Sequence, residues 1–241
     1  MIGRYVLTAL MAGLIAGAVL TGLQVWRLSP LIAAAEVFEK IDDGAATLVT
    51  KAPCKETMPG MKMCVDDGSN EWEPAPGLPR IGFTGGASML AGGGFAVLLA
   101  GLSLLLNAHI TKANGWIWGM CGFFAVHLAP SFGLPPEVPG MPVAHLVARQ
   151  IWWLGTIFAT SAAIYCFALR PEIWAKGVGV VLLALPHLIG APLAATTTSS
   201  LPPTLAADFA AKALGVAAIF WLVMGVALGR LLSPIAEKFE S

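Results

Sequence analysis

Histidine side chains are the groups in this 241-residue sequence that point most directly to metal chemistry. Of the four histidines, His127 and His187 fall inside long stretches without charged residues, and His145 lies just before another such stretch. Imidazole nitrogen is a good ligand for divalent first-row metals such as cobalt and nickel. The plainer alternative is that His127 and His187 only form hydrogen bonds with helix backbones. These three histidines are therefore candidate metal ligands.

Acidic residues near these histidines could complete a metal site. Glu36 and Glu39 are three residues apart, so they would share one helical face just beyond the first apolar stretch. Glu137 and Asp208 are further carboxylates expected at the same side of the membrane, and the thioether of Met141 is nearby. Such oxygen and sulfur ligands can accompany imidazole around a transition metal. We expect Glu36 and Glu39 to contribute to metal binding; the alternative is that the carboxylates are simply solvated.

The cysteines suggest a second kind of chemistry, a disulfide bond. Cys54 and Cys64 lie in a segment rich in proline, glycine and charge, and they could pair in an oxidising compartment. Two free thiols, or a metal clip in a reducing compartment, are the alternatives. Cys121 and Cys166 fall inside apolar stretches and are expected to be small core residues.

The elements that must position these groups are transmembrane helices. The sequence is 57% hydrophobic and only 12% charged, with a mean hydropathy of +0.77, whereas a soluble domain has about a quarter of its residues charged. A spanning helix needs roughly 17–25 apolar residues. Uncharged stretches of that length predict an all-α, polytopic membrane protein, a six-helix transmembrane bundle with helices near residues 5–26, 83–107, 115–132, 150–169, 176–194 and 209–231. The first stretch is too long for a signal-peptide core and has no small-residue cleavage site, so we expect it to be retained.

Basic residues predict the orientation. With the amino terminus in the cytoplasm, the predicted cytoplasmic ends carry most of the Lys and Arg residues outside the first loop, namely Arg4, Lys112, Arg170, Lys176, Arg230 and Lys238. Both termini are then cytoplasmic. The long loop 28–82 is extracytoplasmic, and its first part, residues 31–50, is expected to be a helix lying along the membrane surface. His109 falls at a cytoplasmic boundary.

Prolines and glycines modify several of these helices. Pro130 interrupts the end of the third helix, and Pro186 and Pro192 bracket a short run that contains His187. Broken helices free backbone carbonyls, which transporters use to build ion sites, although a kink without a ligand is equally simple. Two small-x-x-x-small pairs, Gly13 with Gly17 and Gly225 with Gly229, permit close helix crossings.

Three motifs give the chain a family resemblance. The stretch HLAPSFGLPPEVPG at residues 127–140, the sequence RQIWW at 149–153 and the sequence PHLIGAP at 186–192 resemble the CbtA-type predicted cobalt transporter subunits. The glycine-rich first helix, ending at Gln24 and followed by Glu36 and Glu39, is also similar to that family. The resemblance spans nearly the whole chain, and the loop with Cys54 and Cys64 matches it least well.

The resemblance implies a bacterial inner-membrane protein linked to cobalt uptake for cobalamin synthesis. It also implies a small single-helix partner, CbtB, that carries a histidine-rich end. The family is usually described with five helices, whereas the charge pattern of this sequence predicts six.

The leading functional hypothesis is a metal-ion permease subunit with Co²⁺ as the transported ion, and the sequence indicates no particular cofactor. Metal would be collected by Glu36, Glu39 and His145 and would then pass His127 and His187 into the bundle. Because imidazole must be neutral to bind metal, binding should weaken as pH falls through about 6.5. The alternative is a non-transporting accessory subunit of a larger membrane complex. No nucleotide-binding loop, dinucleotide fingerprint or nucleophile motif indicates an enzyme, and we expect lipids rather than nucleic acid around the protein.

Overall fold

Long helices build the whole described part of the chain. In the computed structural model, residues 2–50, 74–75, 77–194 and 199–240 are described, except for the side chains of 41–50 and 235–240. The helices are α1 (Ile2–Leu23), η1 (Gln24–Leu28), α2 (Ser29–Thr50), α3 (Leu78–Leu105), α4 (Gly115–Phe123), η2 (Phe124–Leu128), α5 (Ala129–Ser131), α6 (Leu146–Leu169), α7 (Ile173–Ile189) and α8 (Pro203–Glu240). No strand occurs in these residues, so the predicted all-α class is confirmed.

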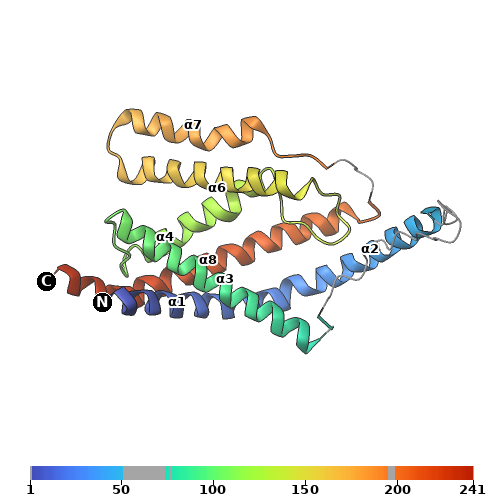
Figure 1. Cartoon of the computed structure of the whole chain (residues 1–241), viewed down its shortest axis with the longest axis horizontal. Coiled ribbons are helices and arrows are strands. Elements are labelled where there is room, and N and C mark those ends of the chain that lie inside the picture. The colour runs from blue at the N-terminus through green and yellow to red at the C-terminus, as the bar shows by residue number, and fades with distance from the viewer. Residues whose placement is uncertain (1, 51–73, 76, 195–198, 241) are drawn as a thin grey trace, which may run out of the picture.

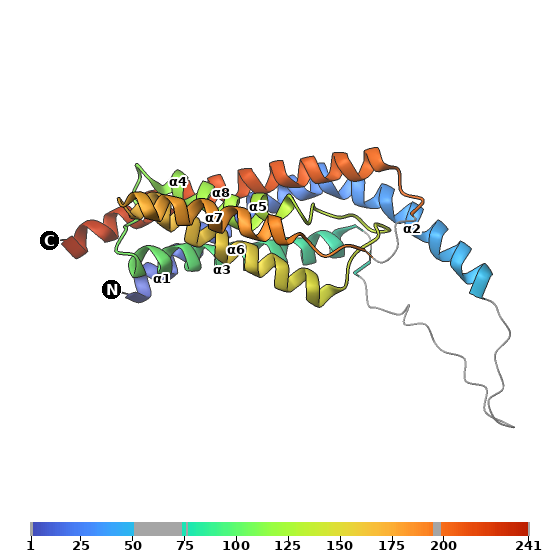
Figure 2. The same ribbon diagram turned by 90° about the horizontal axis from the view of Figure 1, so that it is seen from above.

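Where consecutive helices adjoin without a break, we treat them as one rod. The described helices then form six rods, one for each predicted helical region (Figure 1). The first rod is α1–η1–α2 and the third is α4–η2–α5; α3, α6, α7 and α8 are the others. The helix expected over residues 31–50 is present as α2, but it is a direct continuation of α1 rather than a separate segment. It extends past the rest of the bundle (Figure 2). Cys54 and Cys64 lie outside the described residues.

The helix ends differ from the expected bounds for local reasons. Helix α3 begins at Leu78, because Pro79 fits the first turn of a helix, where its missing N–H is not needed. Helix α7 ends at Ile189 instead of near residue 194, since Gly190 adopts a φ of 85°, which stops a helix. Helix α8 extends beyond 209–231 in both directions.

Two π-helical turns interrupt the first and third rods in the same way. In each, one residue separates the π segment from a proline: Ser29 lies between η1 and Pro30, and Ala129 lies between η2 and Pro130. Proline cannot donate the backbone hydrogen bond of a regular helix. The backbone N–H of the residue just before each proline donates to the carbonyl five residues earlier, as in a π-helix. Ser29 donates to the Gln24 carbonyl, and Ala129 donates to the Phe124 carbonyl. Such turns are frequent at functional sites, and η2 contains His127.

Four of the described helices are long and apolar enough to cross a membrane: Ile2–Lys40, Leu78–Leu105, Leu146–Leu169 and Pro203–Pro234. Helix α7 is a shorter apolar helix of 17 residues. At 1.5 Å per residue, α7 and the rod over residues 115–131 are each about 26 Å long, close to the hydrocarbon thickness of about 30 Å.

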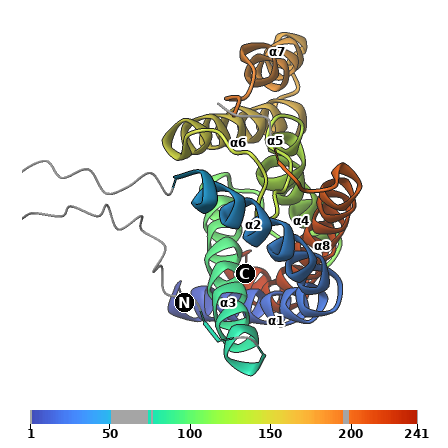
Figure 3. The same cartoon turned by 90° about the vertical axis from the view of Figure 1, so that its right-hand side faces the viewer.

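Glycine contacts hold the first, second, third and sixth rods together. Helix α1 packs on α3 and α8, and α4 packs on α8, as the end-on view in Figure 3 shows. A Cβ atom added to Gly13 would lie 2.3 Å from the carbonyl oxygen of Gly92, and one added to Gly225 would lie 2.3 Å from that of Gly115. Both predicted glycine pairs therefore lie at close helix crossings, where van der Waals contact replaces the hydrophobic effect that is absent in lipid.

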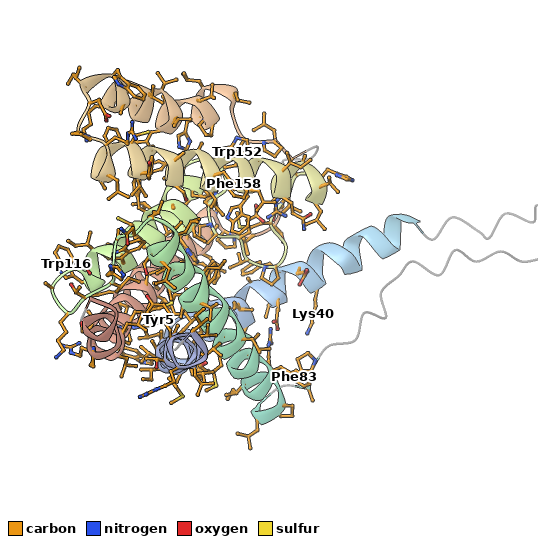
Figure 4. The ribbon with its side chains drawn as sticks, turned by 60° about the vertical axis from the view of Figure 1, so that its left-hand side comes forward. Tyr5, Lys40, Phe83, Trp116, Trp152 and Phe158 are labelled. Atoms are coloured by element: carbon orange, nitrogen blue, oxygen red, sulfur yellow. The ribbon has the colours of Figure 1, made fainter. Side chains whose placement is uncertain are left out.

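Helices α6 and α7 form a separate pair on one side of this group. Helix α7 packs on α6, and α6 reaches the rest of the bundle through η2 and α5. The Lys176 ammonium ties the pair together by donating to the carbonyls of Cys166, Phe167 and Arg170 at the end of α6. Phe158 on α6, labelled in Figure 4, is 71% exposed, and large apolar side chains exposed in this way suit contact with lipid.

Candidate functional site

One end of the bundle gathers three segments that are far apart in the sequence. We call it the α2 end: it comprises α2, the loop 132–145 and residues 199–202. A small apolar cluster holds these segments to the start of α8; its buried members are Leu28, Ala35, Val138, Leu201, Phe209 and Val216. The Ser199 hydroxyl donates to the Gly140 carbonyl at 2.7 Å. The hydrogen bond fixes the proline-rich loop to residues 199–202, and the apolar cluster holds the loop against α2.

Glu36 and Glu39 of α2 are both half-buried at this end. Glu36 forms an ion pair with Arg80, at the start of α3. Glu39 lies against Gly140, because a Cβ atom added to that glycine would be 3.5 Å from the Glu39 Cα. Gly140 has a φ of 79°, a conformation that favours glycine, so the turn of the loop at this point requires it. Because Glu36 is paired with Arg80, a cation that binds Glu36 must compete with the Arg80 guanidinium.

His145 and Glu137 occupy the loop at the same end. His145 immediately precedes α6 and is exposed. Glu137 forms an ion pair with Arg149 in the first turn of α6, and both side chains are mostly shielded from solvent. Burial raises the pKa of the Glu137 carboxyl above its usual value, while the Arg149 guanidinium acts in the opposite direction. This pair fastens the loop to α6.

His187 lines an open groove between the third rod and the α6–α7 pair. The groove has a volume of about 860 Å³ and is mostly apolar, with Phe132, Trp152, Gly190 and Ala191 among its lining residues. The His187 ring meets the rings of Phe132 and Trp152 edge-on, each at a centroid distance of 6.0 Å. Its side chain is exposed, so an ion could reach the imidazole.

His127 faces the other side of the third rod, toward α8. Its Nδ1 atom accepts a hydrogen bond of 3.0 Å from the indole Nε1–H of Trp221. The imidazole also stacks on Phe123 at a centroid distance of 6.5 Å. His127 therefore belongs to the core between η2 and α8, whereas His187 belongs to the groove.

The family described as "probable cobalt transporter subunit (CbtA)" matches residues 2–233. This chain belongs to the CbtA family. No curated protein and no solved structure matches it. The family resemblance seen in the three sequence motifs is thus confirmed. As a CbtA-family subunit with long apolar helices, the chain is a membrane protein that works with other proteins.

In this CbtA-family chain the candidate ligands are spread over three places. Glu36, Glu39 and His145 belong to the α2 end, His187 to the groove and His127 to the core beside α8. Among the residues that the structure describes, no group of three or more His, Cys, Asp or Glu side chains is close enough to hold a metal ion. The fold brings Glu39 to the loop that carries His145, and it keeps His127 and His187 on different sides of the third rod.

Sequence reasoning missed three partners of these residues in the CbtA-family structure. Arg80 and Arg149 pair with acidic residues, which opposite charges next to apolar stretches could have suggested. The third partner is Trp221, whose indole donates directly to His127. Its position in the middle of an apolar stretch was the available signal, since a buried indole N–H needs an acceptor.

Proposed function

We propose that this chain is the membrane subunit of a transporter that carries Co²⁺ across the bacterial inner membrane to supply cobalamin synthesis. The match of residues 2–233 to the probable cobalt transporter subunit family carries this proposal. We infer a transport protein rather than an enzyme. The family description also calls the protein a subunit, which supports a complex with partners, a small single-helix CbtB-like protein being the first candidate.

In the proposed topology all six rods cross the membrane, with both termini in the cytoplasm. The two ends of the described chain lie at the same end of the bundle, opposite the α2 end, as an even number of crossings requires (Figure 1). Lys112 and Arg170 lie in the turns at the termini's side, which agrees with the positive-inside rule. The α2 end is then extracytoplasmic.

In the proposed path Co²⁺ is collected at the α2 end by Glu36, Glu39 and His145. It then passes His187 in the groove and finally His127. Ligands that are spread along a path, rather than gathered in one cage, suit a transported ion, because conduction needs sites that bind weakly enough to release it. The ion pair of Glu36 with Arg80 supports the same view, since it keeps this carboxylate from holding a cation tightly.

Removal of the two helix-associated histidines tests this path. We expect His127→Ala/His187→Ala to lose saturable Co²⁺ binding in the purified protein and Co²⁺ uptake in cells. The control is His109→Ala, at the other end of the bundle. His187→Ala alone is the milder variant, because the ring is exposed and its loss leaves no buried polar group unpaired. Wild-type uptake by the double variant would rule out the path.

A non-transporting accessory subunit is the second candidate. The exposed apolar faces of α6 and α7 favour it, because they could pack against other membrane proteins. Purification in mild detergent separates the two functions. A stoichiometric large complex, in which this chain binds no Co²⁺, would favour the accessory role.

A further inference from the structure

Trp221 is held rigidly at the centre of the helix core. Its side chain is 1% exposed, and the rings of Phe95 and Phe220 pack against it at centroid distances of 5.0 and 5.7 Å. Gly122 on α4 leaves the space for this indole, because an added Cβ would lie 2.1 Å from the six-membered ring. The orientation of the indole N–H is therefore set by packing, before any ligand binds.

The hydrogen bond from this indole determines which nitrogen of His127 carries the proton. An indole N–H can only donate, so the Nδ1 atom that receives it at 3.0 Å must be unprotonated. In a neutral imidazole the proton then sits on Nε2. Because a buried indole N–H without an acceptor is costly, the bond favours this tautomer.

In this tautomer the ring nitrogen that has a lone pair accepts a hydrogen bond, whereas a metal-binding histidine must keep that lone pair for the metal. A ligating histidine offers one ring nitrogen to the metal and donates the N–H of the other to a carboxylate, carbonyl or water. In His127 the lone pair of Nδ1 is occupied by Trp221 and Nε2 carries the proton. Neither nitrogen is free to bind Co²⁺ while the bond exists.

We propose that Trp221 is a positioning residue that holds His127 in a non-ligating form, so that His127 binds Co²⁺ only after the indole hydrogen bond is released. The part concerning Co²⁺ rests on the proposed function, and the part concerning the tautomer does not. Binding of the ion at His127 carries the added cost of breaking one hydrogen bond, which keeps this site weak and lets the ion leave.

Trp221→Phe is the variant that tests the first part. Phenylalanine keeps an aromatic ring in the core and removes the N–H donor, and the Trp118→Phe control accounts for the smaller size of its ring. Nitrogen-15 NMR of histidine-labelled protein, with His127→Gln to assign the signals, should show an unprotonated Nδ1 in the wild type. In Trp221→Phe we expect a mixture of tautomers. Trp118→Phe, the same substitution at a half-buried indole of the same cluster, should leave the His127 signals unchanged.

Titration with Co²⁺ alone, on the same purified proteins, tests the second part. One neutral hydrogen bond is worth about 1 kcal/mol, so Trp221→Phe should bind Co²⁺ about fivefold more tightly than the wild type. Trp118→Phe should bind like the wild type. The gain should vanish when His127→Gln is added to Trp221→Phe, because the effect acts through that histidine.

The outcomes separate the inference from the proposed function. A protonated Nδ1 in the wild type, or an unchanged tautomer in Trp221→Phe, would overturn the positioning role. A tautomer shift with unchanged Co²⁺ affinity would overturn the link to ion binding. A tautomer shift in proteins that bind no Co²⁺ would uphold the role of Trp221 in setting the tautomer while overturning the cobalt proposal itself.

Discussion

Single polar side chains fasten helices to one another at several places in this apolar bundle. The Tyr5 hydroxyl and the Ser103 hydroxyl are 3.0 Å apart between α1 and α3. The Trp152 indole donates to the Pro186 carbonyl and joins α6 to α7, and Lys176 reaches three carbonyls at the end of α6. In a bilayer each such group must find a partner inside the protein, so these contacts select one arrangement of the helices.

Loss of the Lys176 ammonium should loosen the α6–α7 pair. Lys176→Met keeps the aliphatic stem but removes the donor to the Cys166, Phe167 and Arg170 carbonyls. Because the group is half-buried, we expect the free energy of unfolding to fall by about 1–2 kcal/mol. Thermal unfolding in detergent, followed by tryptophan fluorescence, measures the change. Lys112→Met, at an exposed lysine, is the control, and equal unfolding midpoints for the two variants would contradict the role of Lys176 in joining α6 to α7.

At the scale of helices, two close crossings and two π turns shape the bundle. Gly13 meets Gly92 at one crossing, and Gly225 meets Gly115 at the other, each at backbone-to-backbone contact. Both crossings involve a rod that contains a π turn, α1–η1–α2 or α4–η2–α5. A proline after each turn keeps the helix from becoming regular there. The glycines therefore set how near the rods approach, and the π turns change which faces they present.

A methyl group at the α4–α8 crossing should force these helices apart. In Gly225→Ala the new Cβ would lie 2.3 Å from the Gly115 carbonyl oxygen, and overpacking of this kind costs about 1–3 kcal/mol. Gly215→Ala, on the same helix with no atom within 4 Å of its added Cβ, should be neutral or slightly stabilising. Chemical or thermal unfolding of the two variants gives the comparison. Similar stabilities would show that the crossing tolerates greater separation.

At the scale of the whole molecule, the bundle has two unlike ends. One end carries both termini and the turns that contain Lys112 and Arg170, and the other, the α2 end, carries the acidic and histidine side chains proposed to collect the ion (Figure 1). Between them the apolar surface of α3, α6 and α7 is broadly exposed, as expected for helices that face lipid. This asymmetry agrees with the proposed path, in which the ion enters at the α2 end.

Labelling of single cysteines can establish the orientation. In a background with the four native cysteines replaced by serine, Leu193→Cys at the α2 end should react with a membrane-impermeant maleimide in intact cells. Lys112→Cys, at the opposite end, should react only after the membrane is permeabilised. Leu193 is 90% exposed and the Lys112 side chain is also exposed, so access to the reagent depends on the side of the membrane. The reverse pattern would invert the proposed topology and with it the direction of the path.

The sequence by itself determined the class of protein, the six helical regions, the glycine crossings and the family, because hydropathy, small-residue spacing and motifs are local properties of the chain. Only the tertiary structure decided where His127 and His187 face and which arginines pair with Glu36 and Glu137. Each π turn adds one residue to a helical turn, and this rotates every later side chain by about 100° relative to a regular helix. Sequence spacing alone could not anticipate that rotation, so it could not show that the partner of His127 is a tryptophan donor on α8.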